Sequence, residues 1–212
     1  MVLPVQDHYE VARARAVQRL EGRLAPERLS ALGAERSEDA LAVVLPCLCW
    51  QLSVSTETWQ VSLLPEGVGV SVLWEILALN YLGAEAPRSP RSFLSFADIA
   101  EARGYQGAFS SRVLGRLSGG VGRDRDSLKH AVARLGGFAG GGEPLCCMLR
   151  FFPLLEFQIM HHAGDQDLAA ACNVLFPDNL LSLFSMEDGI VAAERLVSAL
   201  EGKTPAAARS AQ

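Results

Sequence analysis

Two stretches of strand-forming sequence constrain this chain more than any other feature. The first, residues 41–64, alternates apolar and polar side chains and predicts a hairpin that turns at Thr56 and Glu57. The second, residues 145–161, predicts two strands that are broken at Pro153. The strands are grouped and do not alternate with helices, which favours a mixed or antiparallel sheet covered by helices over a doubly wound one. We therefore predict an α+β fold in which both stretches build one sheet.

The helical pattern is strongest in residues 70–82, which are apolar almost all round, as is typical of a helix at the centre of a core. The last helix has a clear beginning, because Ser185 can cap it and Glu187 and Asp188 place carboxylates in its first turn. Asp7 can cap a first helix in the same way. Other helices are predicted at residues 96–103, capped by Ser95, and at residues 105–117, 126–135 and 168–176.

The chain has 212 residues, of which half are apolar and 20% are charged, and this excludes a mostly disordered or fibrous protein. The length is sufficient to bury a core, so we predict a single domain over residues 1–203. Residues 204–212 are rich in alanine and serine and are expected to form a flexible tail. The formal net charge of -5 disfavours a nucleic-acid partner, because binding to phosphates requires basic surfaces.

Cysteine use and the N-terminal sequence both favour a cytoplasmic location. The five cysteines are an odd number in a chain of this size, which is not typical of a disulfide framework. The N-terminal residues have neither the basic nor the apolar segment of a secretion signal. The most apolar stretches, residues 70–82 and 144–160, carry Glu75 and Arg150 and are too short or too polar to span a bilayer, so no membrane partner is expected.

The cysteines are not spaced as metal ligands. Cys47 and Cys49 would lie on one face of a strand, about 7 Å apart, and Cys146 and Cys147 would point to opposite faces. No Cys-x2-Cys pair is present. We therefore interpret the cysteines as small buried hydrophobic residues and expect no structural metal bound by them.

The adjacent histidines His161 and His162 are the candidate metal ligands. Imidazole is the commonest metal ligand in proteins and can serve as an axial ligand of haem or a corrinoid. Neighbouring residues of a strand point to opposite faces, so both rings can bind one metal only if the strand ends there, and Gly164 is consistent with such an end. Asp165 and Asp167 could add carboxylate oxygens. The alternative is a strand end with one partly buried and one exposed histidine.

Several motifs follow one another in a characteristic order over residues 70–200. They are Leu77-x-Leu79-Asn80-Tyr81-Leu82, Tyr105-x3-Phe109-x2-Arg112, Gly164-Asp165, Asn173-Val174-Leu175-Phe176-Pro177-Asp178 and Met186-Glu187-Asp188. In this order they resemble the uncharacterised prokaryotic family called domain of unknown function 3786. The chain departs from that family where a halved acidic cluster, Gln166-Asp167-Leu168, stands in place of two glutamates and a phenylalanine, and where Pro177 precedes Asp178.

The resemblance implies a protein of anaerobic bacteria and archaea. Some members of that family are fused to a small iron–sulfur domain of the kind found with corrinoid proteins, and the four-cysteine motif of that domain is absent from this sequence. The resemblance thus implies a link to the metabolism of metal or tetrapyrrole (corrinoid or haem) cofactors. On this basis Tyr105, Arg112 and Asp165 are candidate cofactor-binding residues, in addition to His161 and His162 as metal ligands.

We predict a cytoplasmic binding or accessory protein whose partner is a small molecule or another protein, with the cofactor unidentified. One alternative is an enzyme with a polar site around Tyr105, Arg112, Asp165 and His162, which requires these groups to converge in one pocket. The other alternative is a structural module that binds a partner protein through an exposed apolar patch. Arg112 and Asp165 either form a buried ion pair, or Asp165 faces an open site.

Overall fold

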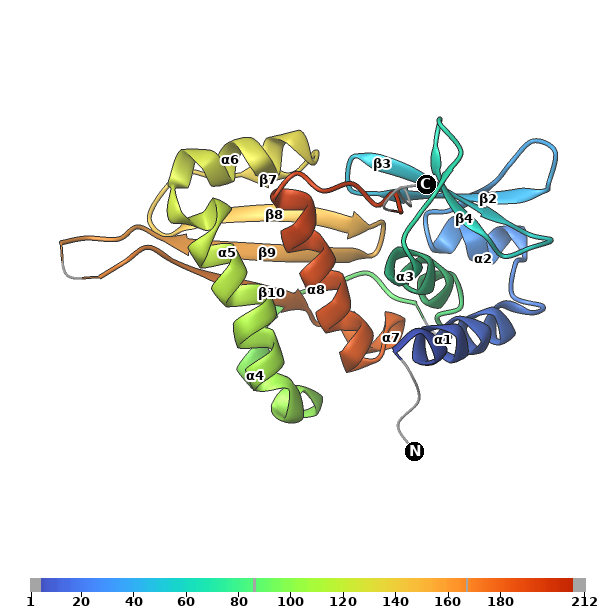
Figure 1. The fold of residues 1–212 in the computed structure, drawn as a ribbon, viewed down its shortest axis with the longest axis horizontal. Helices are drawn as coiled ribbons and strands as arrows, with labels where there is room; N and C mark the ends of the chain where they lie inside the picture. The colour runs from blue at the N-terminus through green and yellow to red at the C-terminus, as the bar shows by residue number, and fades with distance from the viewer. Residues whose placement is uncertain (1–4, 86, 167, 208–212) are drawn as a thin grey trace. The chain divides into compact units, whose positions relative to one another are not determined.

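The computed structural model describes residues 5–85, 87–166 and 168–207. The chain divides into two compact units: unit 1 comprises Met1–Pro87 and Pro205–Gln212, and unit 2 comprises Arg88–Thr204. Each unit holds a five-stranded antiparallel sheet together with helices (Figure 1). These features confirm the predicted α+β class with antiparallel sheets.

The expectation that both strand-forming stretches build one sheet is wrong. Residues 41–64 lie in the sheet of unit 1, and residues 145–161 lie in the sheet of unit 2. The reason is that each stretch finds its hydrogen-bonding partners among strands of its own unit. That residues 1–203 form a single domain, in the sense that both units unfold together, stays a prediction.

The sheet of unit 1 is a meander in which every strand pairs with the next along the chain. A two-residue turn at Leu48 and Cys49 joins the second strand to the third, and the predicted turn after Ser55 joins the third to the fourth. The hairpin predicted in residues 41–64 is thus confirmed and widened to three strands. The strands are β1 (Glu35–Arg36), β2 (Ala42–Cys47), β3 (Trp50–Ser55), β4 (Val61–Leu64) and β5 (Val68–Gly69).

The prediction that Cys47 and Cys49 share a strand face is wrong. Cys47 is the last residue of β2 and is buried, whereas Cys49 lies in the turn and is exposed. Leu48 between them has a φ of 51°, a left-handed conformation of the kind that tight hairpin turns require. The strand therefore ends between the two cysteines, and extended-strand spacing does not apply to them.

The helices of unit 1 are α1 (Val5–Leu20), α2 (Pro26–Ala31) and α3 (Val72–Leu82). The helix predicted at residues 70–82 is confirmed as α3, whose last seven residues are all buried. The Tyr81 hydroxyl is buried within it and donates to the Leu32 carbonyl oxygen at 2.7 Å. Because α1 begins at Val5, Asp7 lies inside the helix, and the cap predicted at this residue is wrong.

The chain returns to unit 1 after its last helix. The Ser71 N–H donates to the Pro205 carbonyl oxygen at 3.0 Å, and the Ala207 N–H donates to the Gly69 carbonyl oxygen at 2.9 Å. Residues 205–207 of the predicted tail thus extend the edge of unit 1 beside β5, and residues 208–212 lie outside the described residues. Unit 2 is an insertion that is joined to unit 1 at both ends.

The sheet of unit 2 has the strand order β6-β10-β9-β8-β7. The two strands predicted in residues 145–161 are confirmed as β8 and β9. The helix predicted at residues 168–176 is wrong, because β10 occupies most of this segment and pairs with β9. The strands are β6 (Phe93–Ser95), β7 (Phe138–Ala139), β8 (Leu145–Phe152), β9 (Leu155–His162) and β10 (Ala171–Pro177).

Helical segments cover one face of this second sheet, and Figure 1 shows α5, α6 and α8 in front of β8, β9 and β10. The caps predicted at Ser95 and Ser185 are confirmed, since their hydroxyls accept from the N–H groups of Ala97 at 3.4 Å and Asp188 at 3.1 Å. The segments are η1 (Phe96–Asp98), η2 (Ala100–Tyr105), α4 (Gln106–Phe109), η3 (Ser110–Gly115), α5 (Arg116–Gly119), η4 (Val121–Arg123), α6 (Arg125–Arg134), α7 (Leu180–Leu183) and α8 (Met186–Leu200).

The predicted helices at residues 96–103 and 105–117 are irregular. The first is divided between the 3-10 helices η1 and η2, and the second contains the π-helical segment η3 between α4 and α5. The helix predicted at residues 126–135 corresponds to α6. Helical periodicity therefore predicts where these segments lie, but it does not distinguish an α-helix from a 3-10 helix or a π-helix.

An aromatic cluster forms the centre of unit 2. Phe96 and Phe109 are stacked with their ring centroids 4.0 Å apart. Phe176 of β10 contacts these two rings at 5.6 and 5.5 Å, and Phe157 of β9 meets Phe176 edge-on at 5.4 Å. Aromatic pairs in such arrangements add stability beyond the area they bury. The cluster joins η1 and α4 to the middle of the sheet.

Candidate functional site

The sheet of unit 2 has two faces of different exposure. Alternate residues of β8, β9 and β10 are buried, and most of the residues between them are partly exposed. The candidate metal ligands follow this alternation, because His161 is 1% exposed whereas His162 is exposed. Since β9 continues through His162, the two rings lie on opposite faces and do not share one metal ion in this arrangement.

His161 is the most unusual side chain of the buried face. Neither its Nδ1 nor its Nε2 has a hydrogen-bond partner among the described residues. Leu145 and Cys172 are its direct neighbours on the adjacent strands, and Cys147 lies two residues from Leu145 on the same face. A buried polar group without a partner costs about 1–3 kcal/mol. His161 is therefore a residue whose missing partner a ligand could supply.

The two thiols near His161 are protonated at neutral pH. Burial raises the pKa of Cys147 to about 11 and that of Cys172 to about 11, with a smaller contribution from neighbouring thiols. The Cys172 thiol contacts the Gly122 carbonyl oxygen at 3.7 Å, and a Cβ on Gly122 would lie 2.5 Å from the Cys172 sulfur. The segment η4 thus packs directly on this thiol, which behaves as a core residue rather than as a thiolate ligand.

Two ionised carboxylates lie in the electrostatic environment of His161. The Ala163 N–H donates to Glu143 at 2.9 Å, and this hydrogen bond is the main cause that lowers the Glu143 pKa. The Ser127 N–H donates to Asp124 at 2.7 Å, which caps α6 and is the main cause that lowers the Asp124 pKa. The electrostatic contribution of His161 to both shifts is smaller. Backbone contacts thus already hold both carboxylates.

The partly exposed face of the same strands is rich in sulfur. Cys146 and Met160 are direct cross-strand partners. Met148 lies two residues from Cys146 on β8, and His162 lies two residues from Met160 on β9, so all four share one face. The Gln158 Nε2 donates to the Cys146 sulfur at 2.8 Å. We name Cys146, Met148, Met160 and His162 the sulfur face.

Among the residues that the structure describes, no three His, Cys, Asp or Glu side chains gather in a metal-binding arrangement. The sulfur face holds two residues of these types, and its other members are thioethers. Sequence reasoning missed this face because it treated Cys146 as a buried residue, whereas the structure leaves it partly exposed. The alternate spacing of residues 146 and 148, and of 160 and 162, was the available signal.

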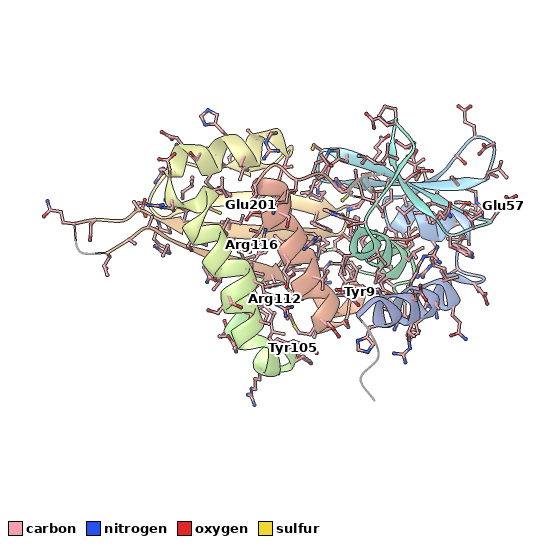
Figure 2. The ribbon with its side chains drawn as sticks, viewed as in Figure 1. Tyr9, Glu57, Tyr105, Arg112, Arg116 and Glu201 are labelled. Carbon is pink, nitrogen blue, oxygen red and sulfur yellow. The ribbon has the colours of Figure 1, made fainter. Side chains whose placement is uncertain are left out.

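The three candidate cofactor-binding residues lie on different elements. Tyr105 ends η2 and is exposed, and Arg112 belongs to η3 (Figure 2). Arg112 pairs with Glu194 of α8 at 3.5 Å while its side chain stays 66% exposed. Asp165 lies in an exposed loop, where its carboxylate accepts from the Leu168 N–H at 2.8 Å. The hypothesis of a buried pair between Arg112 and Asp165 is therefore wrong. Asp167, the other carboxylate suggested as a metal ligand, lies outside the described residues.

Unit 1 contains a cavity of about 480 Å³ on its own sheet. Its lining is mainly polar and uncharged, with one carboxylate, and none of its residues belongs to the sites predicted from sequence. The serines on β3 and β4 occupy alternate positions, so the period-two pattern that predicts the hairpin also contains them. The lining residues are Ala42, Ser53, Ser55, Gln60, Val61, Ser62, Gly67, Gly69, Val70 and Glu75.

These features define an α+β protein with two antiparallel sheets, one bearing a sulfur face and the other a polar cavity. The chain belongs to the family described as Domain of unknown function (DUF3786), which matches residues 25–199. The match begins well before residue 70, where the sequence motifs start. No curated protein and no solved structure matches the chain. Within the described ranges, every helix falls short of the length and apolarity that crossing a membrane requires.

Proposed function

We propose that the protein is a cytoplasmic accessory protein that binds a soft metal ion, with Cu(I) as the best match, on the sulfur face of unit 2. The observation that supports this proposal is the common placement of Cys146, Met148, Met160 and His162 on one partly exposed sheet face. Thiolate and thioether ligands select Cu(I), and imidazole also binds copper. The role requires binding alone and no catalytic step.

The spacing of the sulfur face suits a single ion. Residues directly opposite each other on antiparallel strands have Cβ atoms about 4.5–5.5 Å apart, and diagonal neighbours lie about 7–8 Å apart. Cys146 and Met160 are opposite each other, whereas His162 is diagonal to Cys146. Methionine has three rotatable bonds, so the thioethers of Met148 and Met160 have the reach to approach a shared point.

The hydrogen bond from Gln158 to Cys146 also supports a metal site on the sulfur face. The Gln158 amide N–H group donates to the Cys146 sulfur at 2.8 Å, which orients the sulfur on the exposed face. Groups that hydrogen-bond to a metal ligand orient it and tune its affinity for the metal. Gln158 would therefore act as a positioning residue for Cys146 and would not itself contact the ion.

The test is a titration of the anaerobically purified full chain with Cu(I) in competition with a chromogenic chelator. We expect one bound copper per chain by elemental analysis. Changing a residue that only supports a metal ligand costs about 10–100-fold in affinity for the metal. Cys146 and Met160 are proposed as ligands themselves, so Cys146→Ser and Met160→Leu should each weaken copper binding at least about tenfold. Cys49→Ser is the matched control, because Cys49 is the exposed thiol of unit 1.

Two outcomes would contradict the metal proposal. One is the absence of stoichiometric copper in the wild-type chain. The other is copper that survives both Cys146→Ser and Met160→Leu but is lost in Cys49→Ser, since this would place the ion in unit 1. Circular dichroism of each variant checks that the fold is retained.

A tetrapyrrole is the second candidate ligand, and Phe138 is the observation that favours it. Phe138 on β7 is 69% exposed and lies directly opposite Met148, so it continues the apolar part of the same face. A flat ring could lie on this surface with His162 as an axial ligand. Titration with hemin should then give a shifted Soret band that His162→Ala removes, whereas His130→Ala, on α6, should leave it unchanged.

The enzyme alternative has less support. Arg112 is paired with Glu194, Tyr105 is exposed at the end of η2, and His162 lies on the face of the sheet opposite to the buried one. Chemistry at a polar site needs such groups within hydrogen-bonding reach of one substrate. We therefore place the ligand-binding role before a catalytic one.

A further inference from the structure

We propose that the cavity of unit 1 binds a neutral, polyhydroxylated small molecule of monosaccharide size. Its volume of about 480 Å³ lies in the range of small-molecule sites, about 300–1,000 Å³. All of its lining residues belong to unit 1, so this site is independent of the sulfur face and of any metal bound there.

A row of small polar positions runs across three strands in this cavity. Ser53 of β3 is the cross-strand partner of Ser62 of β4, and Ser62 is the partner of Gly69 of β5. Both serines are partly buried, and within the described residues neither hydroxyl has a hydrogen-bond partner. Each hydroxyl can donate one hydrogen bond and accept two. A ligand hydroxyl group has the same capacity, so it can satisfy both serines at once.

Two glycines keep this side of the cavity open. A Cβ built on Gly69, which stands in the same row as the serines, would meet nothing within 4 Å. Gly67 has a φ of 66°, a left-handed conformation that side chains rarely adopt, and a Cβ there would also meet open space. The turn between β4 and β5 therefore leaves the serine row accessible.

The charge of the cavity favours a neutral ligand. Glu75 is the one charged residue among the described residues that line the cavity, and its Oε2 lies 3.1 Å from the Arg13 Nε. Arg13 is itself held by a hydrogen bond from its Nη2 to the Trp59 carbonyl oxygen at 3.0 Å. An anion would be repelled by Glu75, and a cation would have to compete with Arg13 for the carboxylate. A neutral hydroxyl group can donate to Glu75 without disturbing this pair.

The composition of the lining excludes two other ligand classes. No lysine, arginine or histidine lines the cavity within the described residues, so a phosphate group would lack a cationic partner. Ala42, Val61 and Val70 are the apolar lining residues, which is too little apolar surface for a lipid or a tetrapyrrole. Serine hydroxyls and the Gln60 amide, in contrast, match the alternating donors and acceptors of a sugar or cyclitol.

The test uses the isotope-labelled full chain and a fixed set of probes: D-glucose, D-galactose, D-mannose, N-acetyl-D-glucosamine and myo-inositol. We expect at least one probe to cause saturable NMR chemical-shift changes that centre on residues 53–69. Two ligand hydrogen bonds are lost when Ser53→Ala is combined with Ser62→Ala, so this double variant should weaken binding about tenfold. Ser30→Ala on α2 is the control, because Ser30 does not line the cavity.

A blocking variant keeps the test decisive. Gly69→Leu fills the open space in the serine row and should abolish binding while the chain stays folded. Val68→Leu changes the neighbouring position, whose side chain points to the other face of β5, and should leave binding intact. The proposal is overturned if none of the five probes gives saturable shifts, if Gly69→Leu binds as well as wild type, or if inorganic phosphate saturates the same residues instead.

Discussion

Unit 1 and unit 2 build sheets of the same number of strands by different routes. In unit 1 every strand pairs with its neighbour in sequence, whereas in unit 2 the edge strand β6 pairs with β10, with Ser95 opposite Leu175. Pairing of neighbours closes short loops, and pairing of distant segments must close long ones at a greater entropic cost. The sheet of unit 1 is therefore specified locally, whereas the sheet of unit 2 depends on contacts between distant segments.

The partly exposed faces of the two sheets also differ in chemistry. Unit 1 presents Ser53 and Ser62 beside the ion-paired carboxylate of Glu75, and unit 2 presents Cys146, Met148 and Met160. Hydroxyl groups suit neutral hydrogen-bonding ligands, whereas thiols and thioethers suit soft metals. Two sheets of similar architecture thus offer surfaces suited to different ligands, and stability measurements on variants of each unit test whether the units also differ in stability.

The largest effect is expected for Phe176→Ala in unit 2. Phe176 is fully buried and contacts the rings of Phe96, Phe109 and Phe157, so truncation should cost about 3–5 kcal/mol of unfolding free energy. Urea unfolding can be followed by circular dichroism and by tryptophan fluorescence. The three tryptophans all lie in unit 1, so fluorescence reports on that unit.

This variant also tests the predicted single domain over residues 1–203. Because unit 2 is tethered to unit 1 at both ends, we expect the fluorescence midpoint to move together with the dichroism midpoint. Leu52→Ala, at a fully buried position of unit 1, is the reciprocal variant. A fluorescence midpoint that is unchanged in Phe176→Ala would mean that the units unfold separately.

The second effect concerns close packing around Gly122. A Cβ there would lie 2.5 Å from the Cys172 sulfur and 2.7 Å from the Leu117 carbonyl oxygen, so Gly122→Ala should destabilise the chain by about 1–3 kcal/mol. Gly119→Ala and Gly69→Ala place a methyl group in open space and are expected to be close to neutral or stabilising. The midpoints of thermal unfolding compare the three variants. Equal midpoints would show that η4 can shift to accommodate the methyl group without loss of stability.

The third effect compares helix caps in the two units. The Ser185 hydroxyl accepts from the Asp188 N–H, so Ser185→Ala should cost about 1 kcal/mol. Ser71 stands at the same position before α3 but makes no such hydrogen bond through its side chain. Ser71→Ala should therefore cost a few tenths of a kcal/mol at most. Urea midpoints that fall equally for the two variants would contradict this difference.

The fourth effect is small and concerns the polar residues predicted from sequence. Arg112→Met breaks an ion pair whose arginine is largely exposed, and Asp165→Asn keeps a side-chain acceptor for the Leu168 N–H. Each change should cost less than about 1 kcal/mol. The double variant should equal the sum of the single ones, because the two residues have different partners. A coupling energy above about 1 kcal/mol in urea unfolding would revive the idea that they act together.

The last prediction concerns acid. Asp178 has a lowered pKa mainly because the Arg91 N–H donates to its carboxylate at 2.9 Å. Glu143 has a lowered pKa mainly because the Ala163 N–H donates to its carboxylate. A carboxylate with a folded pKa below its unfolded value contributes stability above the unfolded pKa, and this contribution is lost as the pH falls through the folded pKa. Unit 2 should therefore lose stability below about pH 4, and Asp178→Asn should flatten this dependence. An unchanged pH slope in Asp178→Asn would exclude the contribution.

Much of the local structure could be predicted from particular residues. The strands around Pro153 were found because their residues favour extended backbone, and the last helix because Ser185, Glu187 and Asp188 form a local start signal. Cys47 and Cys49 were misplaced because a tight turn of non-glycine residues gives little warning in sequence. Residues 168–176 were misread because a short apolar run fits a helix or a buried strand equally well.

For the candidate sites, too, some features follow from local sequence and others do not. Strand periodicity places His161 and His162 on opposite faces of any strand that contains both, because this periodicity is a property of the backbone and follows from sequence alone. The folded chain was needed to show that β10 lies beside β9, that Met160 stands opposite Cys146, and that Arg112 pairs with Glu194. Register and long-range pairing depend on which surfaces become buried together, and this is a property of the whole folded chain rather than of any one segment.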